Sequence, residues 1–348
     1  MSVLEEVVGG DRLNHGRPTC SCQTSTLPVY GALDLGTNNC RLLLATPAFD
    51  GFRVIDAFSR ITRLGEGLAD SGALSEPAMT RTVAALRYCA QRLAQRGVQH
   101  VRAVATEACR RASNCAAFLT RIEAETGLSL EIISAEEEAR LALAGCAALL
   151  DRNPPCGLVF DIGGGSTELI RVRVCPDTGM PEIEAFLSLP FGVVTLAEEC
   201  GPAIHEPCGY AATVDQLIGA LHDFDRDGSL GRLAAAAEVQ MLGTSGTVTT
   251  LAGVHLNLAR YSRPAVDGLL MDFNAVATVS RRLLSATAEQ RAAHPCIGRE
   301  RADLVVAGCA ILEAICRVWP AGRLRVADRG VREGVLLSMM HADGAYGE

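Results

Sequence analysis

Apolar and polar positions alternate along the chain in short runs that predict strands and helices in turn. Three extended stretches, interrupted by a glycine turn, lie between residues 29 and 58. Apolar residues at helical spacing follow over 75–96, where Ser75 provides an N-cap and Gly97 a stop signal. Strands and helices then alternate up to about residue 150, which predicts an α/β fold.

A further helix start is indicated at residue 134. Ser134 and Glu137 stand three residues apart, the spacing of a capping box, in which each side chain accepts a hydrogen bond from the other residue's backbone N–H. This spacing predicts a helix from about Glu136 to Leu150. Glu136 and Glu138 fall in the same acidic first turn, and such a run is usually a solvated surface.

Residues 151–157 form the best candidate for a domain boundary, because two prolines and a glycine interrupt the pattern there. We therefore expect one domain over 29–152, a second over 153–328 and a short closing helix over 329–348. The predicted elements of the second domain include a Pro/Gly-rich loop near 201–209, helices near 214–224, 274–286 and 301–319, and a strand at 324–328.

The second domain repeats the beginning of the first. Aligning Asp34 with Asp161 also aligns Gly36 with Gly163, so that a strand, a glycine turn and a second strand recur in the same order. Such internal similarity predicts two domains built on one plan.

The composition fits a globular protein with a core in each domain, since 49% of the 348 residues are hydrophobic. Residues 1–28 are polar and aperiodic, which predicts a disordered tail. The fourteen cysteines are scattered without a C-x-x-C pair, which predicts reduced and mostly buried thiols. Cys20 and Cys22 form an isolated C-x-C in the tail that the sequence does not explain.

The charge distribution disfavours several classes of partner. The net charge is -8 and the basic residues are not clustered, which argues against nucleic acid and against a membrane surface. No apolar run is long enough to span a bilayer and the N-terminus lacks a signal-peptide pattern, so we expect a cytoplasmic protein. Because the chain contains no lysine, arginine side chains and backbone N–H groups must hold any anionic substrate.

Three glycine turns carry the candidate chemistry. Asp34 and Asp161 each end an apolar strand and are followed by glycines, which let backbone N–H groups approach a phosphate closely. The third turn surrounds Gly243. A single glycine turn more often closes a hairpin, but three of them, two with a carboxylate in an apolar context, favour binding of phosphate and metal. Carboxylate and hydroxyl oxygens suit Mg²⁺, with Mn²⁺ as the alternative.

Ten segments between residues 29 and 340 resemble, in order, the signature segments of the exopolyphosphatase / guanosine pentaphosphate phosphohydrolase family. The D-x-G turns are shared with actin-like sugar kinases and chaperones, whereas IISAEEEARLA combined with FDIGGGSTEL is specific to this family. The segments are DLGTNNCRLLLA, RLGEGL, LSEPAMTRT, ATEACRRA, IISAEEEARLA, FDIGGGSTEL, LPFGVVTL, GTSGTVTTLAG, RADLVVAG and DRGVREGVL.

The resemblance implies two actin-like, ribonuclease H-like domains flanking a central cleft, with the closing helix returning to the first domain. The implied reaction is metal-dependent removal by water of the terminal phosphate of inorganic polyphosphate or guanosine pentaphosphate, which releases orthophosphate. These substrates are the implied partners, and a homodimer is left open. Both substrates present the same terminal phosphoanhydride, so the sequence does not separate them.

Site residues carry over by position. Glu138 matches the family's catalytic base, and Arg110 matches an arginine expected to clamp phosphate. Asp161 and Glu168 match metal-associated positions, and Asp34 faces them from the first domain. The residues expected to bind phosphate lie in the three glycine turns and are Thr37, Asn38, Arg41, Gly163, Gly164, Gly165, Ser166, Thr167, Gly243, Thr244, Ser245 and Gly246.

Two further residues bear on the candidate site, and three other functions share some of the same sequence features. Arg63 matches a further family arginine, whereas Glu107 stands where the family usually has a small residue, which leaves substrate contacts on that side open. An actin-like small-molecule kinase shares the glycine turns but gives the EEEAR helix no role, and a non-catalytic sensor of alarmone or polyphosphate does not need Glu138. A metal-dependent HD hydrolase is disfavoured because His222 and Asp223 form a single dyad.

Overall fold

The computed structural model describes residues 27–49 and 51–345. Residues 1–26 of the predicted tail, with Cys20 and Cys22, lie outside the described residues. Every cysteine within the described ranges is a free thiol, and most are buried, as predicted. Among the helices of these ranges, none is both long and apolar enough to cross a lipid bilayer.

The first half of the chain builds a five-stranded sheet in the order β3-β2-β1-β4-β5. Its strands are β1 (Tyr30–Leu35), β2 (Asn39–Ala48), β3 (Gly51–Ile61), β4 (His100–Ala105) and β5 (Glu131–Ile132). Its helices are α1 (Leu68–Ser71), α2 (Glu76–Gln95), α3 (Glu107–Arg111), α4 (Cys115–Thr126) and α5 (Ala135–Cys146), followed by a 3₁₀ turn over Ala147–Leu149. The predicted N-cap Ser75 accepts a hydrogen bond from Ala78 N.

The second half builds a six-stranded sheet in the order β10-β11-β9-β6-β7-β8. Its strands are β6 (Cys156–Ile162), β7 (Thr167–Val174), β8 (Pro181–Leu189), β9 (Val239–Thr244), β10 (Leu270–Asp272) and β11 (Arg323–Val326). Its helices are α6 (Val193–Cys200), α7 (Pro207–His222), α8 (Ser229–Ala235), α9 (Ser245–His255), α10 (Arg263–Val266), α11 (Phe273–Ser285), α12 (Ala288–Ala293), α13 (Val305–Val318) and α14 (Val331–Ala342), with a 3₁₀ turn over Gly201–His205.

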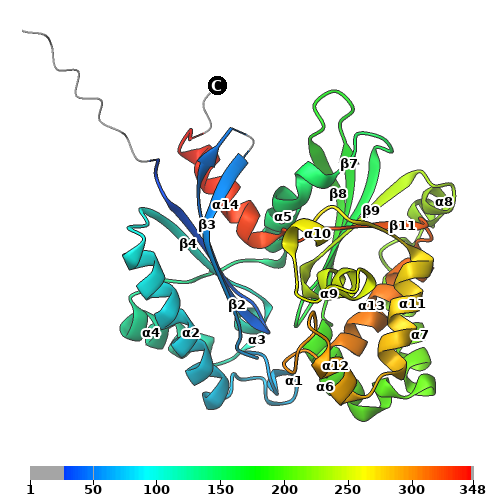
Figure 1. The fold of residues 1–348 in the computed structure, drawn as a ribbon, viewed down its shortest axis with the longest axis horizontal. Coiled ribbons are helices and arrows are strands. Elements are labelled where there is room, and N and C mark those ends of the chain that lie inside the picture. Colours follow the sequence, from blue (N-terminus) through cyan, green and yellow to red (C-terminus); the bar gives the residue numbers. More distant parts are fainter. Residues whose placement is uncertain (1–26, 50, 346–348) are drawn as a thin grey trace, which may run out of the picture.

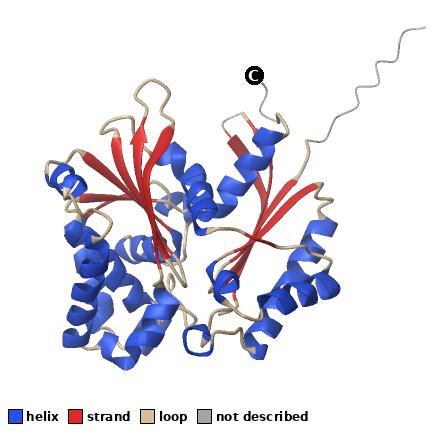
Figure 2. Ribbon diagram, turned by 180° about the vertical axis from the view of Figure 1, so that it is seen from behind, coloured by secondary structure: helices blue, strands red, loops and turns tan. Residues whose placement is uncertain are grey.

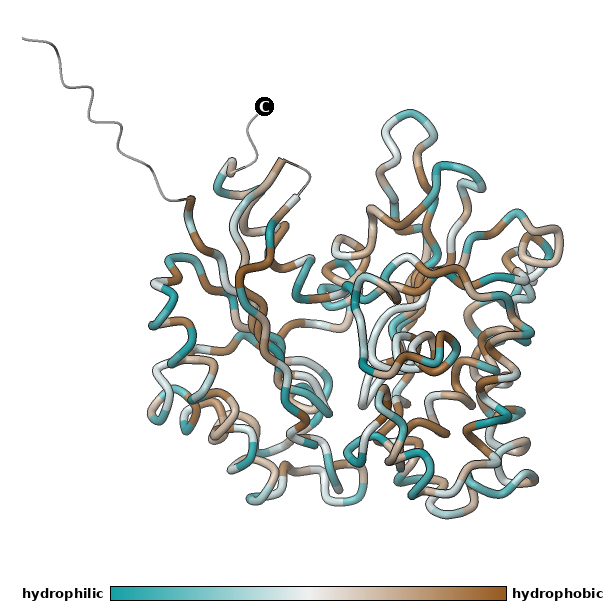
Figure 3. Tube along the Cα trace, in the orientation of Figure 1, coloured by the Kyte–Doolittle hydropathy of each residue, from teal (hydrophilic) through white to brown (hydrophobic). Residues whose placement is uncertain are grey.

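The two sheets share one plan. In each, three antiparallel strands (β1 to β3, β6 to β8) are extended on the side of the first strand by parallel strands (β4 and β5, β9 and β11). Figures 1 and 2 show the sheets side by side, with α2 and α4 on the outer face of the first and α7, α11 and α13 on the outer face of the second. The apolar residues concentrate along the strands, as the hydropathy colouring shows (Figure 3). The prediction of an α/β fold is confirmed.

Helices α5 and α14 cross between the two sheets. Helix α5 follows the strands of the first half, yet Ala139 and Leu143 pack against Ile170 and Val172 of the second sheet. Helix α14 follows the second half, yet its apolar side packs on the first sheet, with a cluster made of Tyr30, Ala32, Leu43, Ala45, Val104, Val331, Val335, Leu336 and Met340 among others. Each half is therefore completed by a helix from the other.

The two crossing helices meet at glycines. A Cβ added at Gly334 would lie 1.9 Å from the carbonyl oxygen of Leu141, and one added at Gly145 would lie 2.1 Å from that of Gly330. Contacts this close allow no side chain, so the backbones themselves touch. Glu138 occupies the first turn of the helix that this contact holds.

Two local predictions were wrong in detail. Ser134 does accept a hydrogen bond from Glu137 N, but the Glu137 carboxylate pairs with Arg102 at 3.2 Å instead of completing the capping box. The loop expected near 201–209 is largely helical, because Pro207 stands at the first position of α7, where its missing N–H breaks no hydrogen bond.

The glycine contact predicts a strong effect of one methyl group. Gly334→Ala should lower the free energy of unfolding by about 3 kcal/mol, since the backbones of α5 and α14 must separate to admit a Cβ. Urea unfolding measures the change. The matched control is Gly219→Ala in α7, where a Cβ meets nothing within 4 Å and the substitution should be neutral or stabilising by up to about 1 kcal/mol. Equal effects of the two substitutions would contradict the prediction.

Candidate active site

A cavity of about 730 Å³ lies between the two halves. Both hairpin turns line it, at 36–39 between β1 and β2 and at 163–166 between β6 and β7. The start of α9 at 244–246, the segment 295–301 and the segment 327–333 before and into α14 complete the lining. The structure thus brings the three glycine turns of the sequence to one place.

The two hairpin turns face each other in direct contact. A Cβ at Gly164 would lie 3.1 Å from Asn38 N, and one at Gly165 would lie 2.6 Å from Thr37 Oγ1. Glycine is therefore needed in the second turn to let the first turn approach. Glycine turns that line a cavity can bring backbone N–H groups close to an anion, and both turns line this one.

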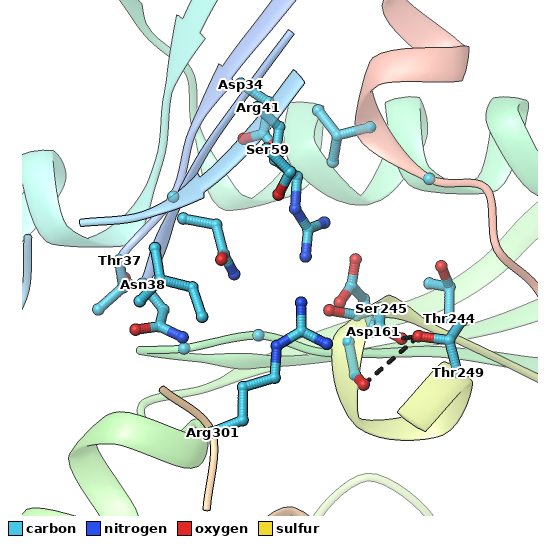
Figure 4. Close-up of a pocket in the computed structure, with 18 of the residues that line it drawn as sticks. Asp34, Thr37, Asn38, Arg41, Ser59, Asp161, Thr244, Ser245, Thr249 and Arg301 are labelled. Carbon is cyan, nitrogen blue, oxygen red and sulfur yellow. Dashed lines mark hydrogen bonds between the residues drawn. The ribbon is translucent and has the colours of Figure 1, made fainter. Parts of the chain in front are cut away.

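The cavity gathers arginines from distant parts of the chain. Arg41 on β2 and Arg301 before α13 point into the space between the turns (Figure 4), and Arg60 and Arg299 also line the cavity. Within the described ranges, none of these four is in an ion pair with an acidic side chain. Burial first, and then the charge of Arg41, lowers the pKa of Arg301, which fits two guanidinium groups that share one small space.

Only Arg41 of these arginines was expected from the sequence. Arg301 is the first residue of the RADLVVAG segment. The motif therefore contains this arginine but gave no indication of its role. Arg332, which also lines the cavity, lies inside DRGVREGVL in the same way. These three arginines come from β2, the loop before α13 and α14, and their convergence depends on how the two halves are assembled.

Three carboxylates contribute negative charge to the site. Asp34 and Asp161 line the cavity at equivalent ends of β1 and β6, and Glu168 occupies the position on β7 paired with Asp161. Removal from bulk solvent raises the pKa of all three, to about 6 for Asp161 and to about 7 for Glu168, where the charge of Asp161 adds to the effect. The Arg41 charge opposes the rise at Asp34 and Asp161.

The donor set fits a metal ion only in part. Within residues 27–49 and 51–345, no three Asp, Glu, His or Cys side chains gather closely enough to hold one ion, so Asp34 does not complete a site with Asp161 and Glu168. The latter two remain a pair of neighbouring carboxylates. Mg²⁺ commonly binds through one or two carboxylates while water and substrate phosphates supply the other oxygens. Asp161 lines the cavity and meets that requirement, whereas Glu168 is buried outside the lining and its Oε1 accepts a hydrogen bond of 2.9 Å from Ser188 Oγ.

Glu138 lines the cavity from the first turn of α5. Its Oε2 accepts a hydrogen bond of 2.8 Å from Arg110 Nη1, and its side chain is 15% exposed. Burial, followed by the charge of Glu168, raises the pKa of Glu138 well above its usual range, while Arg110 acts in the opposite direction. The predicted base therefore faces the cavity next to a guanidinium that favours its ionised form.

Arg110 does not line the cavity as a phosphate clamp would. Its Nε and Nη2 donate to Glu107 Oε2 at 3.1 and 2.9 Å, and its Nη1 donates to Glu138 and to the carbonyl of Ile133. These four hydrogen bonds engage most of the five N–H donors of a guanidinium. The expected contact with phosphate is thus replaced, in this structure, by contacts with two carboxylates.

Two of the residues expected to bind phosphate lie outside the cavity lining, and a third has its hydroxyl engaged. Thr167 is buried and donates to the carbonyl of Phe191 at 2.8 Å. Gly243 packs against the ring of Phe160, which a Cβ would strike at 2.6 Å. Thr244 lines the cavity, but its hydroxyl donates to the Arg329 carbonyl. The remaining expected residues, Thr37, Asn38, Arg41, Gly163, Gly164, Gly165, Ser166, Ser245 and Gly246, do line it.

A second set of contacts joins the two halves on the side opposite α5 and α14. Arg63 Nη2 donates to the carbonyl of Glu300 at 3.1 Å and pairs with Asp303 at 3.0 Å. Gly67 N donates to Glu198 Oε1 at 2.9 Å. In Figure 1, α1, α6 and α12, near which these residues lie in the chain, are at the opposite margin of the interface from α5 and α14.

Two related α/β halves that turn glycine loops toward a shared cavity define a class of proteins with an actin-like fold. Comparison with known proteins identifies one family within this class. The model of the Ppx/GppA phosphatase family matches residues 46–343. Exopolyphosphatase 2 of Mycobacterium tuberculosis is 29% identical over 326 residues, which cover 90% of this chain and 99% of that protein.

Solved structures of similar proteins point to the same family. The Ppx/GppA family member of Aquifex aeolicus is 27% identical with a TM-score of 0.73 and covers 91% of this chain and 99% of its own. An exopolyphosphatase from Cytophaga hutchinsonii is 25% identical with a TM-score of 0.77 and covers 90% and 98%. The chain belongs to the Ppx/GppA phosphatase family, and its two sheets form the two actin-like domains expected from the sequence.

The raised pKa of Asp161 predicts a loss of stability with rising pH. A carboxyl whose pKa is about 6 in the folded protein and near 3.8 in the unfolded chain holds its proton more tightly when folded, so stability falls as pH rises through this interval. Asp161→Asn removes the effect. Without divalent cations, the variant should gain stability over the wild type progressively from pH 4 to pH 7, reaching about 3 kcal/mol at pH 8.

Urea unfolding across this pH range measures the gain. Asp70→Asn serves as the control, because Asp70 is exposed on α1 and loses the same charge. A gain for Asp161→Asn that is constant with pH would show that the carboxylate does not titrate as described.

Proposed function

We propose that the chain hydrolyses the terminal phosphoanhydride of inorganic polyphosphate, guanosine pentaphosphate or both, and releases orthophosphate. The observation that carries the proposal is the position of Glu138. It faces the cavity in which the two glycine turns and the arginines meet, so a base and an anion-binding site share one space. The names of the relatives, an exopolyphosphatase and a Ppx/GppA phosphatase family, support the same reaction.

Each group has a defined task in this reaction. Backbone N–H groups of the turns at 36–39 and 163–166, with Arg41 and Arg301, hold the terminal and following phosphates and neutralise the charge that develops on the leaving oxygen. Glu138 accepts a proton from water as the new oxygen–phosphorus bond forms. The bond between phosphorus and the bridging oxygen breaks, and the shortened chain leaves with that oxygen.

Arg110 keeps Glu138 competent as a base. Burial and the charge of Glu168 raise the pKa of Glu138 and so favour its protonated form, which accepts no proton. The 2.8 Å hydrogen bond from Arg110 and the N-terminal end of α5 both favour the carboxylate form. We therefore assign Arg110 to the orientation and ionisation of Glu138.

Magnesium is the proposed cofactor, with Asp161 and Glu168 as its protein ligands. When bound, the ion would neutralise these two carboxylates and polarise the oxygens of the transferred phosphoryl group. Asp34 lies opposite Arg41 in the register of β1 and β2, and burial raises the pKa of Asp34 against the smaller, opposing effect of the Arg41 charge.

Substitution of Glu138 tests the assignment of the base. Glu138→Gln removes the proton acceptor at almost constant volume, so kcat should fall by roughly a hundredfold or more while orthophosphate affinity changes only a few-fold. The control is Glu136→Gln, since Glu136 is exposed on the same turn and pairs only with Arg140 on its own helix. Comparable turnover by the Glu138 variant and the wild type would refute the assignment.

Phosphate release from several substrates, measured side by side, tests the proposed function itself. Short polyphosphate, long polyphosphate and guanosine pentaphosphate are compared with ATP, each with Mg²⁺ and with a chelator. We expect turnover of at least one of the first three, greatly reduced by the chelator. Transfer of phosphate from ATP to an added acceptor would support a kinase, and tight binding without release would support a sensor.

A further inference from the structure

Glu107 and Ser245 each begin a helix that follows a central strand of their own half. Strand β4 lies beside β1 and strand β9 lies beside β6 in the same parallel arrangement. Each strand leads through a threonine, Thr106 or Thr244, into a helix whose first residue faces the cavity. That residue is Ser245 in the second half and Glu107 in the first. The strand before Glu107 runs further, because Asp34 pairs with Val104 whereas Asp161 pairs with Thr244, so the first half places a carboxylate at the start of its helix.

The Glu107 carboxylate occupies a specific edge of Arg110. Its Oε2 accepts from both Nε and Nη2, at 3.1 and 2.9 Å, and the two side chains are 15% and 17% exposed. The Nε–Nη2 edge is one with which arginine binds the oxygens of a phosphate in a bidentate manner. The other side of the guanidinium, Nη1, is engaged with Glu138.

Glu107 also lies against the glycine turn of the second half. A Cβ at Gly165 would be 3.1 Å from Glu107 Cγ, and Glu107 lines the cavity beside Glu138. The single positive charge of Arg110 is thus shared by two carboxylates at the place where the proposed base must meet the terminal phosphoryl group. An incoming anion therefore meets an arginine whose hydrogen-bond donors are already engaged by carboxylates.

On the basis of the proposed function, we propose that Glu107 sets the anion affinity of the site by occupying, as a built-in carboxylate, the edge of Arg110 that a phosphoryl group would otherwise bind. Orthophosphate or a terminal phosphoryl group reaches Arg110 only by displacing this carboxylate. The exchange weakens the hold on orthophosphate and so favours its release after hydrolysis. Arg41 and Arg301 lie away from this exchange and retain their charge for the rest of the substrate.

Glu107→Ser, which leaves a hydroxyl at the first helical position as at Ser245, and the isosteric Glu107→Gln test the proposal. Isothermal titration with inorganic phosphate should show a Kd lower by about tenfold in both variants, because a like charge next to the bound anion has been removed. Inhibition by orthophosphate should become stronger and KM for the substrate should fall, while kcat stays constant or decreases as product release slows. Glu123→Gln, an exposed change of the same charge on α4, should leave the Kd unchanged.

One outcome of the phosphate titration would contradict the proposal. An unchanged or higher Kd for phosphate in Glu107→Gln, with the unfolding midpoint retained, would show that Glu107 only supports Arg110 and would overturn the proposal. Glu107→Gln decides the matter if Glu107→Ser does not fold. The titration needs no turnover, so a wild type that binds phosphate but hydrolyses none of the substrates would refute the proposed function and leave this test intact.

Discussion

The contact between the backbones of α5 and α14 is the constraint on which the rest of the site depends. Glycines at 145 and 334 let two helices approach until carbonyl oxygens fill the space of missing side chains. Helix α5 carries Glu138 and packs on the second sheet, whereas α14 packs on the first. Glu138, the proposed base, is therefore positioned by both halves at once, and the same contact holds the two halves at a fixed separation.

Electrostatics imposes the second condition. The site contains several buried carboxylates, which repel the anion that it is proposed to bind. Burial raises the pKa of Asp34, Asp161, Glu168 and Glu138 alike. Arginines from four separate segments compensate, and each keeps its charge at any physiological pH. The stability of the fold and the binding of anions are thus coupled. A bound cation would balance the buried carboxylates, and a bound phosphate chain would balance the arginines.

The parts of the structure that local sequence determines could be predicted from it. The cap at Ser75, the alternation of strands and helices, and the pairing of the Asp34 and Asp161 turns follow from neighbours along the chain or from an internal repeat. Contacts between distant segments could not be predicted. The Glu137 carboxylate pairs with Arg102 instead of completing the capping box, and the Arg110 guanidinium pairs with Glu107. Arg301 reaches the cavity only once the second half has folded.

The contacts at the two margins of the interface give the cavity the form of a closed frame. The crossing helices close one margin, and Arg63 with Asp303 and Gly67 with Glu198 close the other. While both sets of contacts hold, the two halves cannot swing apart about either margin. The cavity can widen only after one set breaks, and the ion pair of Arg63 with Asp303, which is partly exposed, is the weaker candidate to hold against such a motion.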